Sequence, residues 1–267
     1  GTAQMSHGVS YYWINKNRST PFFATVPGGL TAQEQDAWIH YGGGQELWDE
    51  LYSNFNLKAF LGGNSGVQMG GWFRNEIKSL DDFKGLKMRM PGLGAEVINR
   101  MGATAVSMPG GEIMPSLESG AIDATEWVGP YNDLAFGFYQ VAKYYYGPGF
   151  HEPGTQAECM VNKEEYDKLP KHLQKIVEHA SVSENNKMLA EFTYGNSAAQ
   201  RKLVDTHGVI MNNFPKEVYD TMFKISEEVV AETANDGAIN KKIYNSWIKF
   251  KEDVRVRAPY AEQGYME

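Results

Sequence analysis

Residues 86–127 open with Leu86-Lys-Met-Arg-Met-Pro91 and close with Ala121-Ile-Asp-Ala-Thr-Glu-Trp127. In the opening run, apolar residues alternate with lysine and arginine and a Pro-Gly pair ends the pattern, as in a β-strand. Residues 94–101 and 111–119 are expected to be helices, and 104–108 and 121–127 are expected to be strands. Strands and helices therefore alternate, which predicts an α/β fold with a parallel sheet.

Two groups of polar residues stand at the carboxyl ends of these strands, where parallel sheets bind their ligands. Arg89 ends the first strand, and Glu126-Trp127 ends the last. Arg89 precedes a helix that begins near Leu93, so its guanidinium and the free helix amides could converge on a carboxylate. A surface ion pair is the alternative for Arg89. Because core packing does not require an acid beside a tryptophan at a strand end, the pair indicates a ligand.

Three side chains offer oxygen atoms of the kind that Na⁺ or Ca²⁺ prefers. They are Gln68, Glu126 and Glu152. Spacing alone leaves open whether the two carboxylates are simply solvated charges. The aromatic runs Tyr11-Tyr12-Trp13 and Tyr144-Tyr-Tyr146 have core packing as their ordinary explanation.

The rest of the chain predicts two lobes. Residues 170–207 contain one glycine and no proline after Pro170, which indicates one long helix, or two end to end, spanning about 50 Å. A strand is expected at 209–212 and helices at 215–234 and 239–254. Without a flexible linker, the lobes are expected to be joined by crossing strands.

Composition excludes several functions. The net charge of −8 argues against a nucleic-acid partner, and the single cysteine, Cys159, excludes an internal disulfide and a multi-cysteine metal cage. The chain has no hydrolase elbow, zinc-protease motif or P-loop. Gly92-Leu-Gly94 is followed by Val97 where a dinucleotide fingerprint needs glycine or alanine, so a Rossmann site is disfavoured.

Four passages resemble the solute-binding proteins of tripartite ATP-independent periplasmic (TRAP) transporters. They are residues 79–91, 101–112, 117–127 and 144–154. Thr125-Glu-Trp127 and His151-Glu-Pro-Gly154 are similar to the subgroup that binds 2-oxo acids with a cation. The resemblance implies an α/β, two-lobe periplasmic binding protein fold with hinge strands and a long lobe-bridging helix.

The resemblance also implies roles for individual residues. Arg89 would bind the ligand carboxylate, and an aromatic wall would come from Tyr11-Tyr12-Trp13, with Tyr12 taken as the contact although the sequence does not choose among the three. Asn64 and Asn132 would be polar neighbours. A Na⁺ or Ca²⁺ ion bound with the ligand would be coordinated by Gln68, Glu126, the Trp127 carbonyl and Glu152.

Lobe I is expected to comprise residues 1–65 and 150–195, lobe II residues 66–149 and 196–238, and a C-terminal helical extension residues 239–267. Family members carry several dozen residues ahead of the segment that matches Gly1–Met5, so lobe I is expected to be incomplete and the signal peptide to lie outside this chain. Which contacts those residues would make stays open.

The resemblance implies a periplasmic location and TRAP membrane subunits as partners. It also implies a homodimer that exchanges the C-terminal helix, whose apolar residues recur at helical spacing and include Trp247 and Phe250. Without a local groove these two side chains would form an exposed apolar patch. Docking of the helix on its own chain is the alternative.

The sequence thus predicts a protein that captures a small 2-oxo or 2-hydroxy monocarboxylate with a cation and performs no chemistry. A metal-dependent enzyme acting on a 2-oxo acid is the alternative, because an oxygen-ligated cation beside a guanidinium also suits enolate chemistry. No histidine falls in a recognisable acid–base motif, and only His151 adjoins the expected site. The sequence leaves open which acid and which cation are bound.

Overall fold

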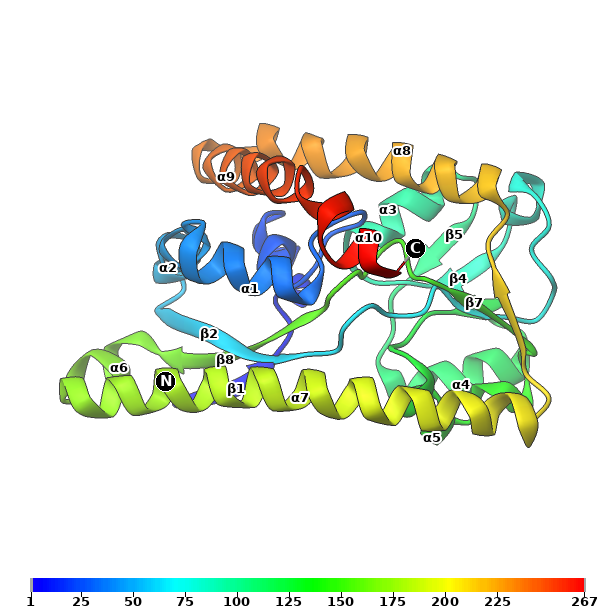
Figure 1. The fold of residues 1–267 in the computed structure, drawn as a ribbon, viewed down its shortest axis with the longest axis horizontal. Coiled ribbons are helices and arrows are strands. Elements are labelled where there is room, and N and C mark those ends of the chain that lie inside the picture. Colours follow the sequence, from blue (N-terminus) through cyan, green and yellow to red (C-terminus); the bar gives the residue numbers. More distant parts are fainter. Residues whose placement is uncertain (1, 267) are drawn as a thin grey trace.

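Two β-sheets lie at opposite ends of α7 (Lys171–Asp205), a single helix of 35 residues, in the computed structural model, which describes residues 2–266 (Figure 1). A helix of this length extends about 50 Å. The predicted long helix is therefore confirmed as one element that runs beneath both lobes. The two-lobe α/β fold is also confirmed.

The smaller sheet is antiparallel, with the strand order β1-β8-β2. Helices α1 and α2 lie between this sheet and the C-terminal helices (Figure 1). The elements of this lobe are β1 (Met5–Gly8), the 3₁₀ turns η1 (Ser10–Trp13) and η2 (Thr20–Phe23), α1 (Ala32–Tyr41), α2 (Gly44–Ser53), β2 (Leu57–Asn64), β8 (Gln156–Asn162) and α6 (Lys163–Lys168).

The larger sheet has the order β5-β4-β6-β3-β7-β9 and is mixed. Strand β4 runs parallel to β5 and β6, as predicted, but β3 is antiparallel to both of its neighbours, so the expectation of a wholly parallel sheet is wrong. The strands are β3 (Gly71–Phe73), β4 (Lys87–Arg89), β5 (Thr104–Val106), β6 (Ala124–Thr125), β7 (Tyr144–Gly147) and β9 (Ile210–Asn213).

The strand expected at residues 121–127 is shorter than predicted. The Ile122 amide donates to the Ser116 carbonyl of the preceding helix, so the chain is still tied to that helix at this point. Only Ala124 and Thr125 pair with strands on both sides. Glu126 and Trp127 therefore lie just beyond the sheet, where the predicted ligand site requires them.

The helices predicted at residues 94–101, 111–119, 215–234 and 239–254 are confirmed to within two residues at each end. They are α3 (Gly92–Arg100), α4 (Gly110–Ser119), α8 (Lys216–Glu232) and α9 (Ala238–Arg255). The other helices of this region are η3 (Leu80–Phe83), α5 (Pro130–Phe136), η4 (Phe138–Gln140), η5 (Thr233–Asp236), η6 (Ala258–Tyr260) and α10 (Glu262–Met266). In the described residues, no helix combines the length and the hydropathy needed to cross a membrane.

The crossings between the lobes at residues 65–70 and 148–155 are extended loops, not the strands that were expected. They lie side by side, because the Gln68 amide donates to the Glu152 carbonyl at 3.0 Å and the Ser65 amide donates to the Thr155 carbonyl at 3.0 Å. Candidate ligand-binding residues therefore lie on the segments that connect the lobes. The residue boundaries proposed for the lobes stay a prediction.

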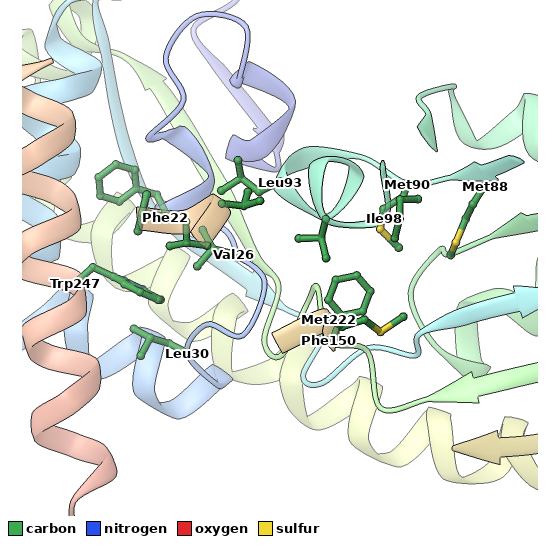
Figure 2. Close-up of a cluster of buried hydrophobic side chains, with 14 of the residues drawn as sticks. Phe22, Val26, Leu30, Met88, Met90, Leu93, Ile98, Phe150, Met222 and Trp247 are labelled. Carbon is green, nitrogen blue, oxygen red and sulfur yellow. The ribbon is translucent and has the colours of Figure 1, made fainter. Parts of the chain in front are cut away.

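One large hydrophobic core continues from the smaller lobe into the larger one. Figure 2 shows Phe22, Val26 and Leu30 near Trp247, with Met88 and Met222 farther along the same cluster. Burying such side chains is the main favourable contribution to folding.

The C-terminal helix α9 packs on its own chain. Trp247 is 2% exposed and its ring meets that of Phe22 edge to face at 5.3 Å. The Trp38 indole on α1 donates to the Ser246 hydroxyl at 3.2 Å. The expectation that Trp247 and Phe250 lack a local groove is therefore wrong, since α1, α2 and η2 provide one.

The end of α4 offers a test of this local structure. Gly120 follows the helix with φ 75°, a left-handed conformation that side chains with a Cβ disfavour, and no atom lies within 4 Å of the place that a methyl group would take. We expect Gly120→Ala to lower the free energy of unfolding by about 1 kcal/mol through backbone strain alone.

Gly111 is the matched control, because it lies inside the same helix with equally open space around it. Gly111→Ala should raise the free energy of unfolding by about 0.5–1 kcal/mol. Urea denaturation measures both values, and equal effects of the same sign at the two positions would contradict the assigned helix end.

Candidate functional site

A cavity of about 220 Å³ lies between the lobes, against the middle of α7. Each lobe contributes polar and aromatic side chains, and α7 contributes two apolar ones. The lining residues are Val9, Tyr11, Tyr12, Ser65, Gln68, Arg89, Trp127, Val128, Asn132, Thr155, Ala157, Met188 and Phe192. The structure thus brings together five residues that the sequence proposes for the site: Tyr12, Gln68, Arg89, Trp127 and Asn132.

Arg89, at the end of β4, is the only charged side chain in this lining and is 2% exposed. One guanidinium nitrogen, Nη1, forms an ion pair with the Glu126 carboxylate. The Nε atom is buried and has no hydrogen-bond partner in the described chain. The guanidinium carbon lies 5.1 Å from the centre of the Trp127 ring, which favours the cation. One edge of Arg89 is therefore paired, while the other has an unused donor.

Two buried carboxylates and a histidine form a cluster behind Arg89. Glu126 and Glu152 are 1% and 3% exposed, and one ligand atom from each of them and from His151 lies within 4.8 Å of the others. Burial, followed by the charge of Glu126, raises the pKa of Glu152 to about 7. Because the two acids disfavour each other's charge, a cation between them would be stabilised.

Gln68 offers a further oxygen. Its amide nitrogen donates to the Ser65 hydroxyl at 3.1 Å, but the amide oxygen Oε1 is buried and accepts no hydrogen bond within residues 2–266. A buried acceptor without a partner costs about 1–3 kcal/mol, so such atoms commonly face a ligand or an ion. With Glu126 and Glu152, this atom makes a set of hard oxygen donors that fits Na⁺ or Ca²⁺.

Trp127 and Asn132 complete the wall on the larger lobe. The Trp127 indole nitrogen and the Asn132 amide oxygen are both buried without a partner in the described structure. Gly110 lies so close to the Trp127 ring that a Cβ there would be 2.6 Å from it, which fixes the ring against the start of α4. Both residues therefore have unused polar atoms next to a cavity that they line.

The aromatic run near the amino end divides into two parts. Tyr11 is 8% exposed and Tyr12 is 52% exposed, and their rings meet edge to face at 4.7 Å in the cavity lining. Burial, with Glu152 next, raises the pKa of Tyr11 well above its ordinary value, so its hydroxyl is neutral. Trp13 instead lines a separate small hollow with Tyr52 and Phe55. Tyr11 and Tyr12, rather than Trp13, are thus in a position to contact a ligand.

Asn64 does not reach the cavity lining. Its amide nitrogen donates to the Gln156 side chain at 3.2 Å, and its amide oxygen accepts from the Gly66 backbone at 2.8 Å. These bonds shape the turn that leads to Gln68. The structure therefore places Asn64 behind the candidate site and gives it a structural role.

Sequence reasoning assigned no role to several residues near the cavity. His151 lies 3.4 Å from Glu126 through Nε2, and the Thr155 hydroxyl donates to the Glu152 carboxylate. Met188 and Phe192 come from α7. Their sequence signals are that His151 adjoins Glu152 within the motif His151-Glu-Pro-Gly154 and that the two apolar residues are four apart on one helix face.

A further buried carboxylate lies in the smaller lobe, outside this cluster. Glu158 in β8 is fully buried and accepts a hydrogen bond from the Tyr52 hydroxyl at 2.8 Å. Burial raises its pKa from the ordinary 4.5 to about 7, against the opposing effects of Tyr52 and Trp13. The folded state therefore disfavours the ionised form of Glu158.

This shift predicts a pH dependence of stability. A raised folded-state pKa means that the folded protein binds the proton more tightly, so the free energy of unfolding falls as the pH rises from about 4.5 to 7. Glu158→Gln, which has no such proton, should remove about 3 kcal/mol of that fall. Denaturation at several pH values measures how steeply the free energy of unfolding falls with pH. The control Glu46→Gln, at an exposed side chain, should show the same slope as the wild-type protein. A wild-type slope in Glu158→Gln would contradict the raised pKa of Glu158.

Comparisons with known proteins show which family the chain belongs to. Residues 1–236 match the family described as bacterial extracellular solute-binding protein, family 7 (DctP). The chain is 42% identical over 254 residues to a monocarboxylate 2-oxoacid-binding periplasmic protein of Nostoc sp., covering 95% of this chain and 70% of that protein.

Two solved structures share its fold closely. A TRAP periplasmic solute-binding protein from Pseudoalteromonas atlantica, with bound sodium and pyruvate, is 43% identical, with a TM-score of 0.95 over 100% of this chain and 81% of that one. A TRAP transporter solute-binding protein from Bordetella bronchiseptica, a mixed-occupancy dimer with calcium and picolinate, is 41% identical, with a TM-score of 0.96 over 99% and 79%.

These proteins are binding proteins, so the alternative of a metal-dependent enzyme is not supported. The periplasmic location expected from the sequence agrees with the extracellular family and with the periplasmic relatives. The extent of the family match and the shared two-lobe fold lead to one conclusion: the chain belongs to bacterial extracellular solute-binding protein family 7, as the solute-binding component of a TRAP transporter.

Proposed function

We propose that the protein captures a small 2-oxo or 2-hydroxy monocarboxylate together with a Na⁺ or Ca²⁺ ion and delivers it to TRAP membrane subunits. The observation that carries this proposal is a buried guanidinium in the wall of an interlobe cavity, next to a cluster of buried carboxylates. The ligands of the relatives, pyruvate with sodium and picolinate with calcium, support the same chemistry.

Arg89 is proposed to bind the ligand carboxylate. Its unpartnered Nε leaves a donor available while Nη1 stays on Glu126. A guanidinium presents its N–H groups in a fixed planar fork that matches a carboxylate. The ligand carboxylate and Glu126 would then both bind the Arg89 guanidinium.

The bound cation is proposed to be coordinated by Gln68, Glu126, the Trp127 carbonyl and Glu152. Its charge would compensate the two buried acids and attract the oxygens of an organic anion. The apolar and aromatic side chains around the cavity, including Trp127 and Phe192, would exclude water from the ligand. Asn132 is proposed as a polar neighbour, whereas Asn64 would act only through the turn before Gln68.

A calorimetric titration with pyruvate tests the proposal. Binding should be observed in buffer that contains Na⁺ or Ca²⁺ and should weaken strongly after chelation in sodium-free buffer. Equal affinity in both buffers would reject the cation, and no heat or stabilisation with pyruvate, 2-oxobutyrate or lactate would reject the ligand class. A turnover assay on the same acids should show no product.

A homodimer through the C-terminal helix is a further part of the proposal. Because α9 fills a groove on its own chain, an exchanged dimer would place the partner's α9 in the same groove with the same contacts. The Bordetella relative is a dimer, which supports a dimeric state but does not say which surfaces meet. We expect light scattering to give twice the chain mass of 29.9 kDa, and a monomer at tens of micromolar would contradict the dimer.

A cross-linking test separates helix exchange from other dimers. Lys242 on α9 and Glu50 on α2 form an ion pair at 2.7 Å, so a carbodiimide can join the amine and the carboxylate directly. This coupling should give covalent dimers if the helices are exchanged, and Glu50→Gln should reduce their amount. Coupling within monomers alone would contradict the exchange.

A further inference from the structure

The segment between β6 and α5 contains the Trp127 carbonyl, which the proposed function assigns to the cation. Residues 126–129 belong to no helix or strand. In the described part of the chain, the Trp127 carbonyl accepts no backbone hydrogen bond. The direction of this carbonyl is therefore set by whatever holds the neighbouring peptide groups.

Asp133 on α5 is a buried carboxylate that contacts this segment. Its side chain is 1% exposed. The oxygen Oδ1 accepts from the Val128 and Gly129 amides, each at 3.1 Å. The oxygen Oδ2 accepts from the Trp72 indole at 2.8 Å and from the Tyr145 hydroxyl at 2.7 Å. One oxygen of Asp133 therefore holds the segment, while the other is held by the interior of the larger lobe.

The two donors to Oδ2 form a rigid base. Trp72 and Tyr145 are both 0% exposed, and their rings stack with centroids 3.9 Å apart. They lie opposite each other on the paired strands β3 and β7. Because the sheet fixes both donors, it also fixes the carboxylate of Asp133 and the position from which Oδ1 holds the segment.

The bonds to Oδ1 set the direction of two consecutive carbonyls. The Val128 amide and the Trp127 carbonyl belong to one trans peptide group, whose N–H and C=O point in opposite directions. When the Val128 N–H points at Asp133, the Trp127 carbonyl points away from it. The next peptide group is held at both ends, since the Gly129 amide donates to Asp133 and the Val128 carbonyl accepts from the Met69 amide at 3.0 Å.

The bond from Met69 extends this arrangement to the other lobe crossing. Met69 follows Gln68, whose amide oxygen is a second proposed ligand of the cation. Asp133 thus acts directly on the peptide group of Trp127 and lies one further peptide group from the segment that contains Gln68. Residues that orient metal ligands from behind commonly change the metal affinity by about ten- to a hundredfold.

We infer that Asp133 is a positioning residue for the cation site: it holds the Val128 and Gly129 amides and so directs the Trp127 carbonyl toward the ion. A charged acceptor on the N–H side of a peptide group also polarises the group and strengthens its carbonyl oxygen as a ligand. Asp133 does not line the cavity, so it acts only through these peptide groups. The inference rests on the proposed function for its effect on Ca²⁺, but its effect on the segment is independent of any ligand.

Asp133→Ala tests the inference. In sodium-free buffer with excess pyruvate, calorimetric titration of Ca²⁺ should show an affinity about ten- to a hundredfold weaker than that of the wild-type protein. Asp133→Asn keeps one acceptor oxygen for the Val128 and Gly129 amides and should recover part of this loss. The titrations are done at about pH 8.5, because burial raises the pKa of Asp133 to about 7 and the carboxylate is ionised above that value.

Pyruvate affinity at saturating Ca²⁺ separates positioning from general damage. It should be nearly that of the wild-type protein in both Asp133 variants, because Arg89 is unchanged and the cation site is then filled. Tyr145→Phe is the matched control, since it removes a buried hydroxyl from Oδ2 but leaves Oδ1 on the two amides. It should lower the free energy of unfolding without changing the Ca²⁺ affinity.

Hydrogen–deuterium exchange of the ligand-free protein gives a second readout. Exchange in peptides that cover residues 127–133 should be about tenfold faster in Asp133→Ala than in the wild-type protein. The same peptides should exchange at the wild-type rate in Tyr145→Phe. This difference depends only on the bonds to Oδ1.

Wild-type Ca²⁺ affinity in both Asp133 variants would overturn the inference, and so would an equal loss in Tyr145→Phe, because the carboxylate would then be a general structural contact. If Asp133→Ala fails to fold, Asp133→Asn decides: its Ca²⁺ affinity should lie below that of Tyr145→Phe, and equal values would overturn the inference. If the wild-type protein binds neither Ca²⁺ nor pyruvate, the proposed function fails, and exchange in residues 127–133 alone decides whether Asp133 holds the segment.

Discussion

Arg89→Ala is expected to weaken pyruvate binding by more than about a hundredfold, or at least about 3 kcal/mol. The side chain is 2% exposed and is the only charged group in the cavity lining, so no neighbouring cationic side chain can replace it there. Without it, the ligand carboxylate and Glu126 would both be buried without a guanidinium partner. Calorimetry in calcium-containing buffer measures the change.

Arg89→Lys should also weaken binding severely. A lysine ammonium can neutralise one charge, but it cannot donate in a planar fork to the ligand while keeping its bond to Glu126. Arg100→Ala is the matched control, because Arg100 pairs with Glu232 on the surface, away from the cavity. Near-wild-type affinity in Arg89→Ala would refute the role of Arg89, provided that the control also binds normally.

Glu126→Gln and Glu152→Gln are expected to weaken pyruvate binding by lowering the occupancy of the cation, each by about ten- to a hundredfold. The number of carboxylates sets the charge of a cation site and hence its affinity. Raising the Ca²⁺ concentration should therefore restore part of the lost pyruvate affinity in both variants. Titrations of pyruvate at several fixed Ca²⁺ concentrations measure this coupling.

The Glu126 variant provides an additional distinction. Removing its charge also releases Arg89, which should favour the ligand carboxylate, so loss of affinity would have to come from the cation. In chelated, sodium-free buffer, Glu126→Gln should then bind pyruvate no more weakly than the wild-type protein. Glu232→Gln, at an exposed ion pair, is the control. Equal losses with and without cation would contradict the proposed coordination.

The sequence predicted those parts of the fold that depend on local periodicity. The alternation around Met88 follows from which face each residue buries, and the absence of proline after Pro170 permits an unbroken helix. Strand β4 and helix α7 are found where these patterns place them. Strand ends in turn located Arg89 and Glu126.

Features that depend on contacts between segments far apart in the chain could not be predicted from local patterns. Strand β3 has three residues, and its antiparallel position between β6 and β7 is fixed by hydrogen bonds to segments more than 50 positions away in the chain. The groove for Trp247 is built by η2, α1 and α2, which no pattern within α9 reveals. An amphipathic helix shows that it needs a partner surface, but not which surface that is.

The site shows the same limit. Oxygen-bearing side chains on separate segments were recognised by their chemistry, and the folded chain brings Gln68, Glu126 and Glu152 into one region. That Asn64 shapes a turn and that Trp13 faces away from the cavity depends on side-chain directions. Buried acids such as Glu158 have no sequence signature, since a lone acid in a strand resembles any surface charge.

A crystal structure of the protein grown with pyruvate and CaCl₂ tests cation-assisted capture of the acid most directly, through the anomalous difference density of calcium. We expect a calcium peak between the Gln68 amide oxygen and the carboxylates of Glu126 and Glu152, with the pyruvate carboxylate on Arg89. Well-defined pyruvate without a cation peak, or pyruvate bound away from Arg89, would contradict this mode of binding.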